Sequence, residues 1–186
     1  MVVSLGLNMQ ETMIKITSAF YQVSIKKFQF LIEEFSFGKA KKKADEGVYR
    51  LIYQNKTTAV VIGLEWREQY IYVELFQLVN GEIQENPILI NSESKLTGFN
   101  LEDLLALRIP SLKLDCKYFN KPLTVELVND IVTHYSDCVR KYARDILMGD
   151  FSIFTKLDAI VKNRVQEESL VGTGHGLIRK KPLADF

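Results

Sequence analysis

The chain has few cysteines, which form the disulfides of small extracellular proteins, and few histidines, which with cysteine commonly bind metals. It contains 2 cysteines, 2 histidines and 1 tryptophan among 186 residues. Cys116 and Cys138 are too few for a disulfide framework, so we expect free thiols in a reducing compartment. No apolar run approaches the roughly 18 residues that cross a bilayer, and no Lys or Arg precedes the short apolar run at the N-terminus. These absences predict a cytoplasmic protein with no membrane partner and no signal peptide.

An excess of either charge sign is also missing, because the formal net charge is +1. A protein that binds nucleic acid usually has a basic excess, since its affinity comes from neutralising phosphates. We therefore expect no nucleic-acid partner. The apolar fraction of 47% and the charged fraction of 25% are those of an ordered globular protein.

The length of 186 residues fits a single domain, although two small ones stay open. We place this domain at residues 1–166. Residues 167–186 contain several glycines and a proline, and we expect them to form a flexible C-terminal tail. Met9 and Met13 leave a later natural start open, in which case residues 1–12 are disordered.

Four strand-like segments follow one another with short turns between them. Asn55–Lys56 can turn the chain between the first two. Asn80–Gly81 predicts a type I′ hairpin before the fourth, because both central residues of that turn need positive φ. Pro87 removes a ladder donor and places the fourth segment at a sheet edge. Such short connections predict an antiparallel meander. The segments are Val48–Gln54, Thr58–Trp66, Gln69–Val79 and Glu82–Ile90.

The helical spacing of apolar residues predicts one helix before the sheet and three after it. Asn100 is the expected N-cap of a short helix, and Gly149 ends the longest one. Lys39–Glu46 is expected to form a polar loop whose Lys41–Lys43 run is solvated. The predicted fold class is therefore α+β, with an N-terminal helix, a four-stranded antiparallel β-meander, and then three helices packed on the sheet. The predicted helices are 18–35, 101–107, 124–148 and 155–164.

A metal or cofactor site is not predicted. His134 and Cys138 share a helical face at positions i and i+4, and Cys116 and His175 complete four ligands by count. Structural zinc ligands usually come in close pairs from tight turns, which these four residues do not provide, so we expect no metal. Gly172–Gly176 has neither the spacing nor the following helix of a phosphate-binding loop, so we expect no cofactor.

No catalytic residue is predicted either. Glu33 and Glu34 are adjacent on a helix and diverge in direction, and Glu65 and Glu68 flank an exposed turn. The second and third strands are apolar on both faces, so helices or another subunit should cover both faces of the sheet. Two alternatives therefore stay open: a small enzyme with a site between the sheet and the long helix, or a structural homodimer.

The turn between the second and third strands carries the best candidate for a binding site. Trp66 and Arg67 are residue types enriched at binding hot spots, and with Glu68 they are expected to project from a rigid turn. The alternative is that Trp66 closes the sheet against a helix while Arg67 pairs with a neighbouring Glu. We predict a partner-binding site at Trp66, Arg67 and Glu68.

Three stretches of the chain belong together as a pattern. They are FQFLIEEFSFG (Phe28–Gly38), VVIGLEWREQYIYVEL (Val60–Leu75) and YARDILMGDFSIFTKLDAIVKNRV (Tyr142–Val165). The pattern resembles small uncharacterised bacterial α+β proteins of the toxin-immunity type, and the third stretch, with its Gly149–Asp150 break, is the most distinctive. This resemblance implies a non-enzymatic cytoplasmic protein that binds and blocks a partner protein such as a toxin. It supplies no site motif from which functional residues are assigned.

Overall fold

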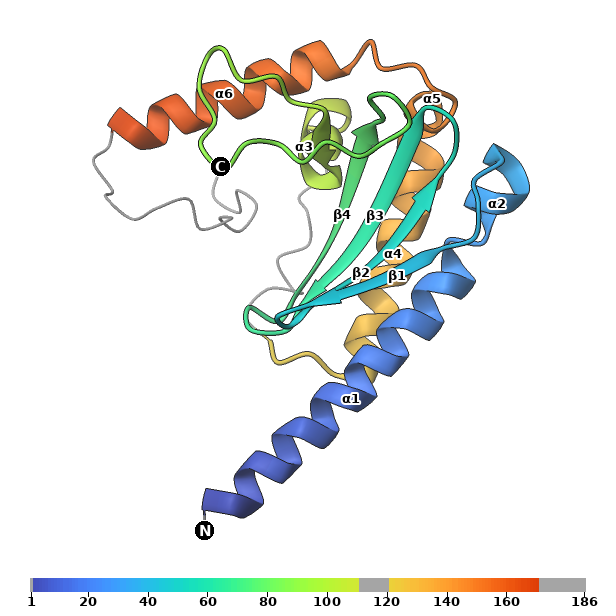
Figure 1. Cartoon of the computed structure of the whole chain (residues 1–186), viewed down its shortest axis with the longest axis vertical. Helices are drawn as coiled ribbons and strands as arrows, with labels where there is room; N and C mark the ends of the chain where they lie inside the picture. The colour runs from blue at the N-terminus through green and yellow to red at the C-terminus, as the bar shows by residue number, and fades with distance from the viewer. Residues whose placement is uncertain (1, 111–120, 171–186) are drawn as a thin grey trace.

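The computed structural model describes residues 2–110 and 121–170, and it confirms the α+β class. The strands are β1 (Lys41–Asp45), β2 (Val48–Gln54), β3 (Thr58–Glu65), β4 (Tyr70–Gln77) and β5 (Gly98–Asn100). The helices are α1 (Val2–Lys27), α2 (Phe30–Phe35), α3 (Leu101–Arg108), α4 (Val125–Tyr142), α5 (Arg144–Leu147) and α6 (Phe154–Leu170). In this part of the chain one five-stranded antiparallel sheet has the order β1–β2–β3–β4–β5, and α1 and α4 lie behind it (Figure 1).

The helix predicted over residues 18–35 is divided in the structure into α1, which reaches back through residues 2–12, and α2. Phe28 and Phe30 are both buried, and their ring centroids lie 5.9 Å apart. One straight helix cannot place residues two positions apart on the same face, so the helix breaks between them. Ser36 ends α2 in a left-handed conformation with φ of 56°.

β1 occupies the segment where a polar loop was predicted, and it contains the Lys41–Lys43 run. It pairs with β2 across a two-residue turn at Glu46–Gly47. All of its side chains are exposed, so no apolar alternation marks it as a strand in the sequence. Lysines on an outer strand also discourage pairing with another chain.

β3 is the central strand, and all of its residues except Glu65 are buried. The turn before it forms at Asn55, as the sequence predicted, but through a side-chain contact rather than positive φ. Asn55 Oδ1 accepts hydrogen bonds from the backbone amides of Thr57 at 3.0 Å and Thr58 at 2.8 Å. The first three predicted strands correspond to β2, β3 and β4, so their positions were predicted correctly from the sequence.

The fourth predicted strand, Glu82–Ile90, is not a strand. The turn before it does form, with φ of 55° and 80° at Asn80 and Gly81. However, the pairing after this turn stops at one bridge between Val79 and Glu82, and β5 takes the place beside β4. Pro87 cannot donate a ladder hydrogen bond, which favours the irregular path that the chain takes here.

The second face of the sheet is covered, in part, by the segment that follows β4. Val61 of β3 and Phe76 of β4 are 4% and 5% exposed. Leu78 and Ile83 pack against them from that segment. The expectation that both faces of the central strands are covered is confirmed, and this part of the cover comes from the same chain.

The helices after the sheet differ from prediction at their ends. Thr124 caps α4 by accepting a hydrogen bond from the Leu127 amide at 3.1 Å. The helix predicted over 124–148 ends at Tyr142, and α5 follows after a break. α6 extends to Leu170, so the first residues of the predicted tail are helical, whereas residues 171–186 lie outside the described part.

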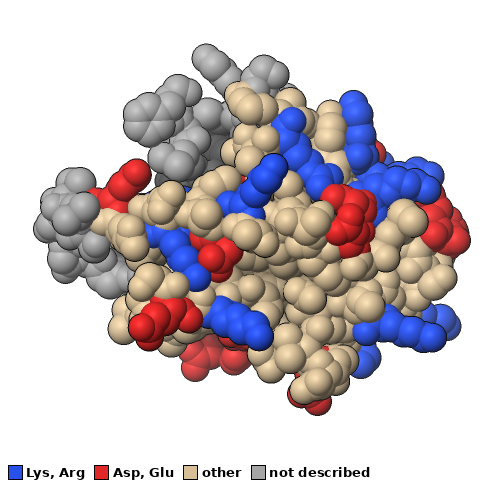
Figure 2. Space-filling view, turned by 90° about the horizontal axis from the view of Figure 1, so that it is seen from above, with Lys and Arg blue, Asp and Glu red and all other residues tan. Residues whose placement is uncertain are grey.

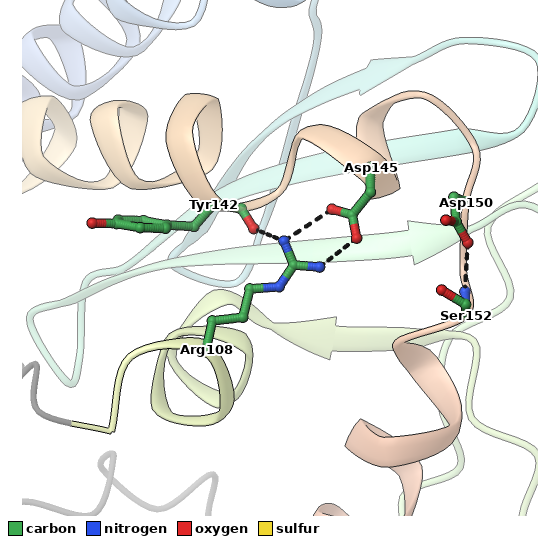
Figure 3. A network of polar contacts seen from close by, with 5 residues as sticks. All are labelled: Arg108, Tyr142, Asp145, Asp150 and Ser152. Carbon is green, nitrogen blue, oxygen red and sulfur yellow. Dashed lines mark hydrogen bonds and ion pairs between the residues drawn. The ribbon is translucent and has the colours of Figure 1, made fainter.

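The distinctive stretch with the Gly149–Asp150 break is linked to α3 (Figure 3), and it also contacts the sheet. Arg108 at the end of α3 donates hydrogen bonds to the Tyr142 carbonyl and to both carboxylate oxygens of Asp145. Burial works to raise the pKa of Asp145, but the hydrogen bonds and charge of Arg108, together with a backbone amide, outweigh it and lower that pKa.

The same stretch contacts the sheet at the turn between β2 and β3, and we call this contact between α5 and the turn the joint. Thr58 Oγ1 donates to the Ile146 carbonyl at 3.0 Å, and Asn55 Nδ2 donates to the Leu147 carbonyl at 3.3 Å. The last two carbonyls of α5 thus accept hydrogen bonds from the sheet side, and the Ile146 carbonyl also accepts one from the Gly149 amide. The stretch therefore has a structural role in this fold.

Candidate protein-binding site

The predicted site lies on the turn between β3 and β4, residues 66–69, which we call the tip. The Trp66 amide donates to the carbonyl of Gly47 in the β1–β2 turn at 2.9 Å. The Gln69 side-chain oxygen accepts a hydrogen bond from the Leu123 amide, just before α4, at 2.9 Å. The tip is therefore fastened to the rest of the fold at both of its ends.

The structure separates the three predicted site residues. Trp66 is half-buried and packs against the main hydrophobic core, which is the structural alternative that we considered for it. Arg67 and Glu68 are exposed, and neither side chain forms a hydrogen bond or ion pair with another described residue. The alternative pairing of Arg67 with a neighbouring Glu is therefore not seen in the described part of the chain.

A hollow of about 240 Å³ opens beside the tip, between it and the β1–β2 turn. Its volume is below the roughly 300–1,000 Å³ of typical small-molecule sites. It therefore fits one or two side chains of a protein better than it fits a cofactor. The hollow is lined by Asp45, Glu46, Gly47, Val48, Arg50, Glu65 and Arg67.

One wall of the hollow is held in place from below by the sheet. Arg50 Nε donates a hydrogen bond to the Tyr72 hydroxyl at 3.1 Å. Tyr72 is 2% exposed, and its ring lies against Gly63, where an added Cβ would come within 2.1 Å of the ring. The absence of a side chain at Gly63 thus lets Tyr72 pack onto the sheet and orient Arg50.

The lining of the hollow can bind charged groups. It combines the carboxylates of Asp45, Glu46 and Glu65 with the guanidinium groups of Arg50 and Arg67. Among these described lining residues there is no thiol, hydroxyl or imidazole side chain. Hydrogen-bond acceptors and donors stand side by side, which suits a partner surface that carries charges of both signs.

The gap between the sheet and α4, where the alternative catalytic site was placed, holds a buried carboxyl group. Glu102 of α3 is 5% exposed, and its Oε1 accepts hydrogen bonds from the hydroxyls of Tyr135 at 2.6 Å and Tyr70 at 3.2 Å. Burial raises the pKa of Glu102, although both tyrosine hydrogen bonds act in the opposite direction. Burial, with a smaller effect of Glu102, also raises the pKa of Tyr135 well above its usual value.

The other oxygen of Glu102, Oε2, is closed to solvent and makes no hydrogen bond to a described residue. A substrate cannot reach this carboxyl group in the present conformation. We interpret the cluster as a polar link between α3, α4 and β4 rather than as a reactive site.

Cys138 and His134 lie on the same face of α4, as their spacing predicted, with 3.7 Å between Sγ and Nε2. Burial, with a smaller effect of the Asp137 charge, raises the pKa of the Cys138 thiol to about 11. The thiol is therefore protonated at neutral pH, and a protonated thiol is a weak nucleophile.

Several residues weighed for metal or phosphate binding, Cys116, His175 and Gly172–Gly176, lie outside the described residues. Within residues 2–110 and 121–170, no three or more His, Cys, Asp or Glu side chains gather closely enough to hold a metal ion. Across the same ranges, the helices are all too short or too polar to span a membrane.

Comparison with protein-family models, with curated proteins and with solved structures finds no match to this chain. The function has to be inferred from the geometry of the site.

The sequence located the tip but not the residues beside it. Asp45 and Glu46 were assigned to a loop, and the Glu46–Gly47 pair was the one available signal for the hairpin that brings them to the tip. Glu102 was missed as well, because a Glu beside an Asp in the first turn of a short helix does not show which neighbours will bury it. Its burial depends on β4 and α4, which are distant in sequence.

Proposed function

We propose that this protein is a non-enzymatic protein-binding module whose partner-binding surface is the tip together with the adjoining hollow. The observation that carries the proposal is the hollow itself, where exposed Arg67 stands beside the carboxylates of Asp45, Glu46 and Glu65. Binding energy at interfaces concentrates in a few residues, with Arg enriched among them. A charged, concave surface beside such a residue favours recognition of another protein.

The way the tip is fastened supports the same proposal. Its hydrogen bonds to Gly47 and Leu123 hold the turn before any partner arrives. A surface that is ordered in advance loses little conformational entropy on binding, so more of the contact energy is available as affinity. In this proposal Arg67 and Glu68 contact the partner, while Trp66 supports the turn from the core side.

The partner that we propose is a protein whose working surface this chain covers, as an immunity or inhibitor protein covers a toxin in the cytoplasm. This choice of partner rests on the resemblance of the Tyr142–Val165 stretch and its neighbours to bacterial proteins of the toxin-immunity type. The stretch itself has a structural role and is not proposed as a binding site. The resemblance therefore supports only the type of protein, and the geometry of the tip supports the location of the binding surface.

A double variant at the tip tests the proposal. Arg67→Ala plus Glu68→Ala should fold normally, since both side chains are exposed and exposed substitutions usually change stability by less than about 0.5 kcal/mol. It should recover at least about tenfold less partner than the wild type in a pull-down from the native cell, which corresponds to about 1.4 kcal/mol.

The matched control removes the same two charge types from α6. Lys156→Ala plus Glu167→Ala, both exposed, should retain the partner at the wild-type level. Equal recovery by the tip variant and the wild type would place the interface elsewhere and refute the proposal. Thermal unfolding of all three proteins verifies that any loss is not due to misfolding.

A further inference from the structure

The loop between β4 and β5 exposes two large aliphatic side chains next to each other. Ile88 is 85% exposed and Leu89 is 76% exposed. For comparison, the exposed Met148 and Val125 stand apart from each other at 70% and 43%. Adjacent exposed aliphatic residues are costly in water, and they often mark a contact with another molecule.

This loop is held in shape on the side that precedes the aliphatic pair. Asn86 Nδ2 donates to the Gly98 carbonyl at 2.6 Å, and Asn86 Oδ1 accepts from the Thr97 amide at 2.9 Å. Thr97 Oγ1 also donates to the Gln84 carbonyl at 2.7 Å. Pro87, directly before the pair, restricts the backbone further.

A second turn holds the loop on the side that follows the pair. Asn91 Oδ1 accepts a hydrogen bond from the Glu93 amide at 2.9 Å, and the Asn91 amide donates to Ser94 Oγ at 2.9 Å. Ile88 and Leu89 are therefore presented between two hydrogen-bonded supports. Such presentation lowers the entropy lost when side chains enter a pocket.

The exposed charges along the segment that carries the pair are mainly negative. Glu82, Glu85 and Glu93 are exposed in this segment, and Lys95 is its exposed cation. Over the wider end of the molecule where α5 and α6 lie, positive and negative side chains are interspersed with uncharged areas (Figure 2). The excess of acidic side chains is thus a property of residues 82–95.

We propose that Ile88 and Leu89 insert into an apolar pocket of a protein partner whose rim carries lysine or arginine residues. The two aliphatic side chains on a convex, fixed loop fit a concave apolar pocket. The glutamates beside them complement a basic rim and would contact it as the pair enters the pocket.

Two other occupants fit the loop less well. The cytoplasmic face of a membrane is negatively charged and attracts basic segments, so Glu82, Glu85 and Glu93 would oppose insertion of the loop. In a second copy of this chain, the hollow beside the tip is lined by charged groups and is a poor receptor for two aliphatic side chains.

The loop and the tip are separate surfaces. The tip directly precedes β4 and the loop follows it, so they lie at opposite ends of that strand (Figure 1). The loop contact therefore goes beyond the function proposed for the tip, and either one can fail without the other.

The test uses the full chain with a photo-cross-linking amino acid in place of the exposed Ser92, three positions after Leu89. Adducts formed in the native cell are mapped by peptide sequencing, and the protein identified is then purified. We expect the adducts to map to an apolar pocket with a Lys or Arg rim. In calorimetry with that purified protein, Ile88→Ser plus Leu89→Ser should weaken binding at least about tenfold.

The matched control is Val125→Ser plus Met148→Ser, which removes exposed apolar surface elsewhere and should change affinity less than about twofold. Glu85→Lys should weaken binding as well, and more so at low salt. The tip variant, Arg67→Ala plus Glu68→Ala, is measured in parallel. Its affinity shows whether the tip contributes to binding, independently of the effect of the loop variant.

Four outcomes overturn the proposal. Two come from cross-linking: the absence of a specific adduct, and adducts that map to a surface without a basic rim. The third is binding to phosphatidylcholine–phosphatidylglycerol vesicles by the wild type but not by the loop variant. The fourth is a dimer of the wild type in sedimentation that the loop variant does not form.

Discussion

Glu102 is a carboxyl group whose side-chain partners, among the residues that the structure describes, are two tyrosine hydroxyls. Burial is the largest influence on it and raises its pKa above the ordinary value of 4.5. A buried group of this kind is most stable in its neutral form, because the ionised form loses its hydration. The stability of the fold should therefore depend on pH through this residue.

The sign of that dependence follows from linkage. Because the folded-state pKa of Glu102 is raised, its contribution to stability is complete below pH 4.5 and is lost as the pH rises through the folded-state value. Glu102→Gln stays neutral, so its free energy of unfolding should fall less than that of the wild type as the pH rises. Urea denaturation from about pH 4 to about pH 8 measures both slopes.

The comparison rests on slopes, because the Gln amide lowers stability by a constant amount if its NH₂ group is left unpaired. Glu82→Gln, the same substitution at an exposed position, is the matched control. Parallel curves for the wild type and Glu102→Gln would contradict the assignment of the pH dependence to this carboxyl group.

At the scale of elements, the joint at the end of α5 depends on a residue that no other amino acid replaces easily. Gly149 has φ of 88°, and an added Cβ would lie 2.9 Å from Thr57 Oγ1 in the β2–β3 turn. The backbone conformation and the close approach to the sheet both favour glycine here. This explains in physical terms why a Gly149–Asp150 break separates two helices in the sequence.

Gly149→Ala should therefore destabilise the protein more than Gly81→Ala. Gly81 has φ of 80° but no atom within 4 Å of an added Cβ, so its substitution carries only the left-handed backbone strain, about 1–2 kcal/mol. Gly149→Ala adds a steric clash with Thr57, which should lower stability by about 1 kcal/mol more. Chemical denaturation of both variants gives the difference, and equal losses would show that the joint can shift to accept the methyl group.

The helices and strands that could be located from the sequence are those that carry a clear pattern of apolar residues within their own length. The apolar runs of β2, β3 and β4 and the stripe of α4 identify buried structure locally. β1 and β5 were missed for two reasons. The side chains of Lys41–Asp45 are all exposed, and Gly98–Asn100 is too short to show a period. β5 also borders a loop fixed by Asn86, a contact between residues twelve positions apart that a local pattern does not contain.

The candidate site was located from sequence in part, for a similar reason. A turn between two clear strands puts Arg67 and Glu68 on the surface whatever surrounds them. The hollow needs the β1–β2 turn to meet the tip, through the hydrogen bond between Trp66 and Gly47. Such a meeting of two hairpins is set by the pairing of the whole sheet.

At the scale of the whole molecule, one continuous sheet and its joint to the helices connect two surfaces that we propose for binding. The hollow beside the tip is charged and concave, and the Ile88–Leu89 loop is apolar and convex. Surfaces of different chemistry at the two ends of one strand suit either a large partner or two partners. Binding at the tip is the central claim, because the proposed function depends on it.

Hydrogen exchange measured by mass spectrometry, on the full chain with and without the partner recovered by the wild type, tests that claim most directly. Binding at the tip should slow amide exchange in residues 45–48 and 65–69, which line or form the hollow and the tip. The Lys156→Ala plus Glu167→Ala control should show the same protection, and the tip variant should show none. Unchanged exchange in both segments, with protection confined to other surfaces such as α1 or α6, would contradict the account.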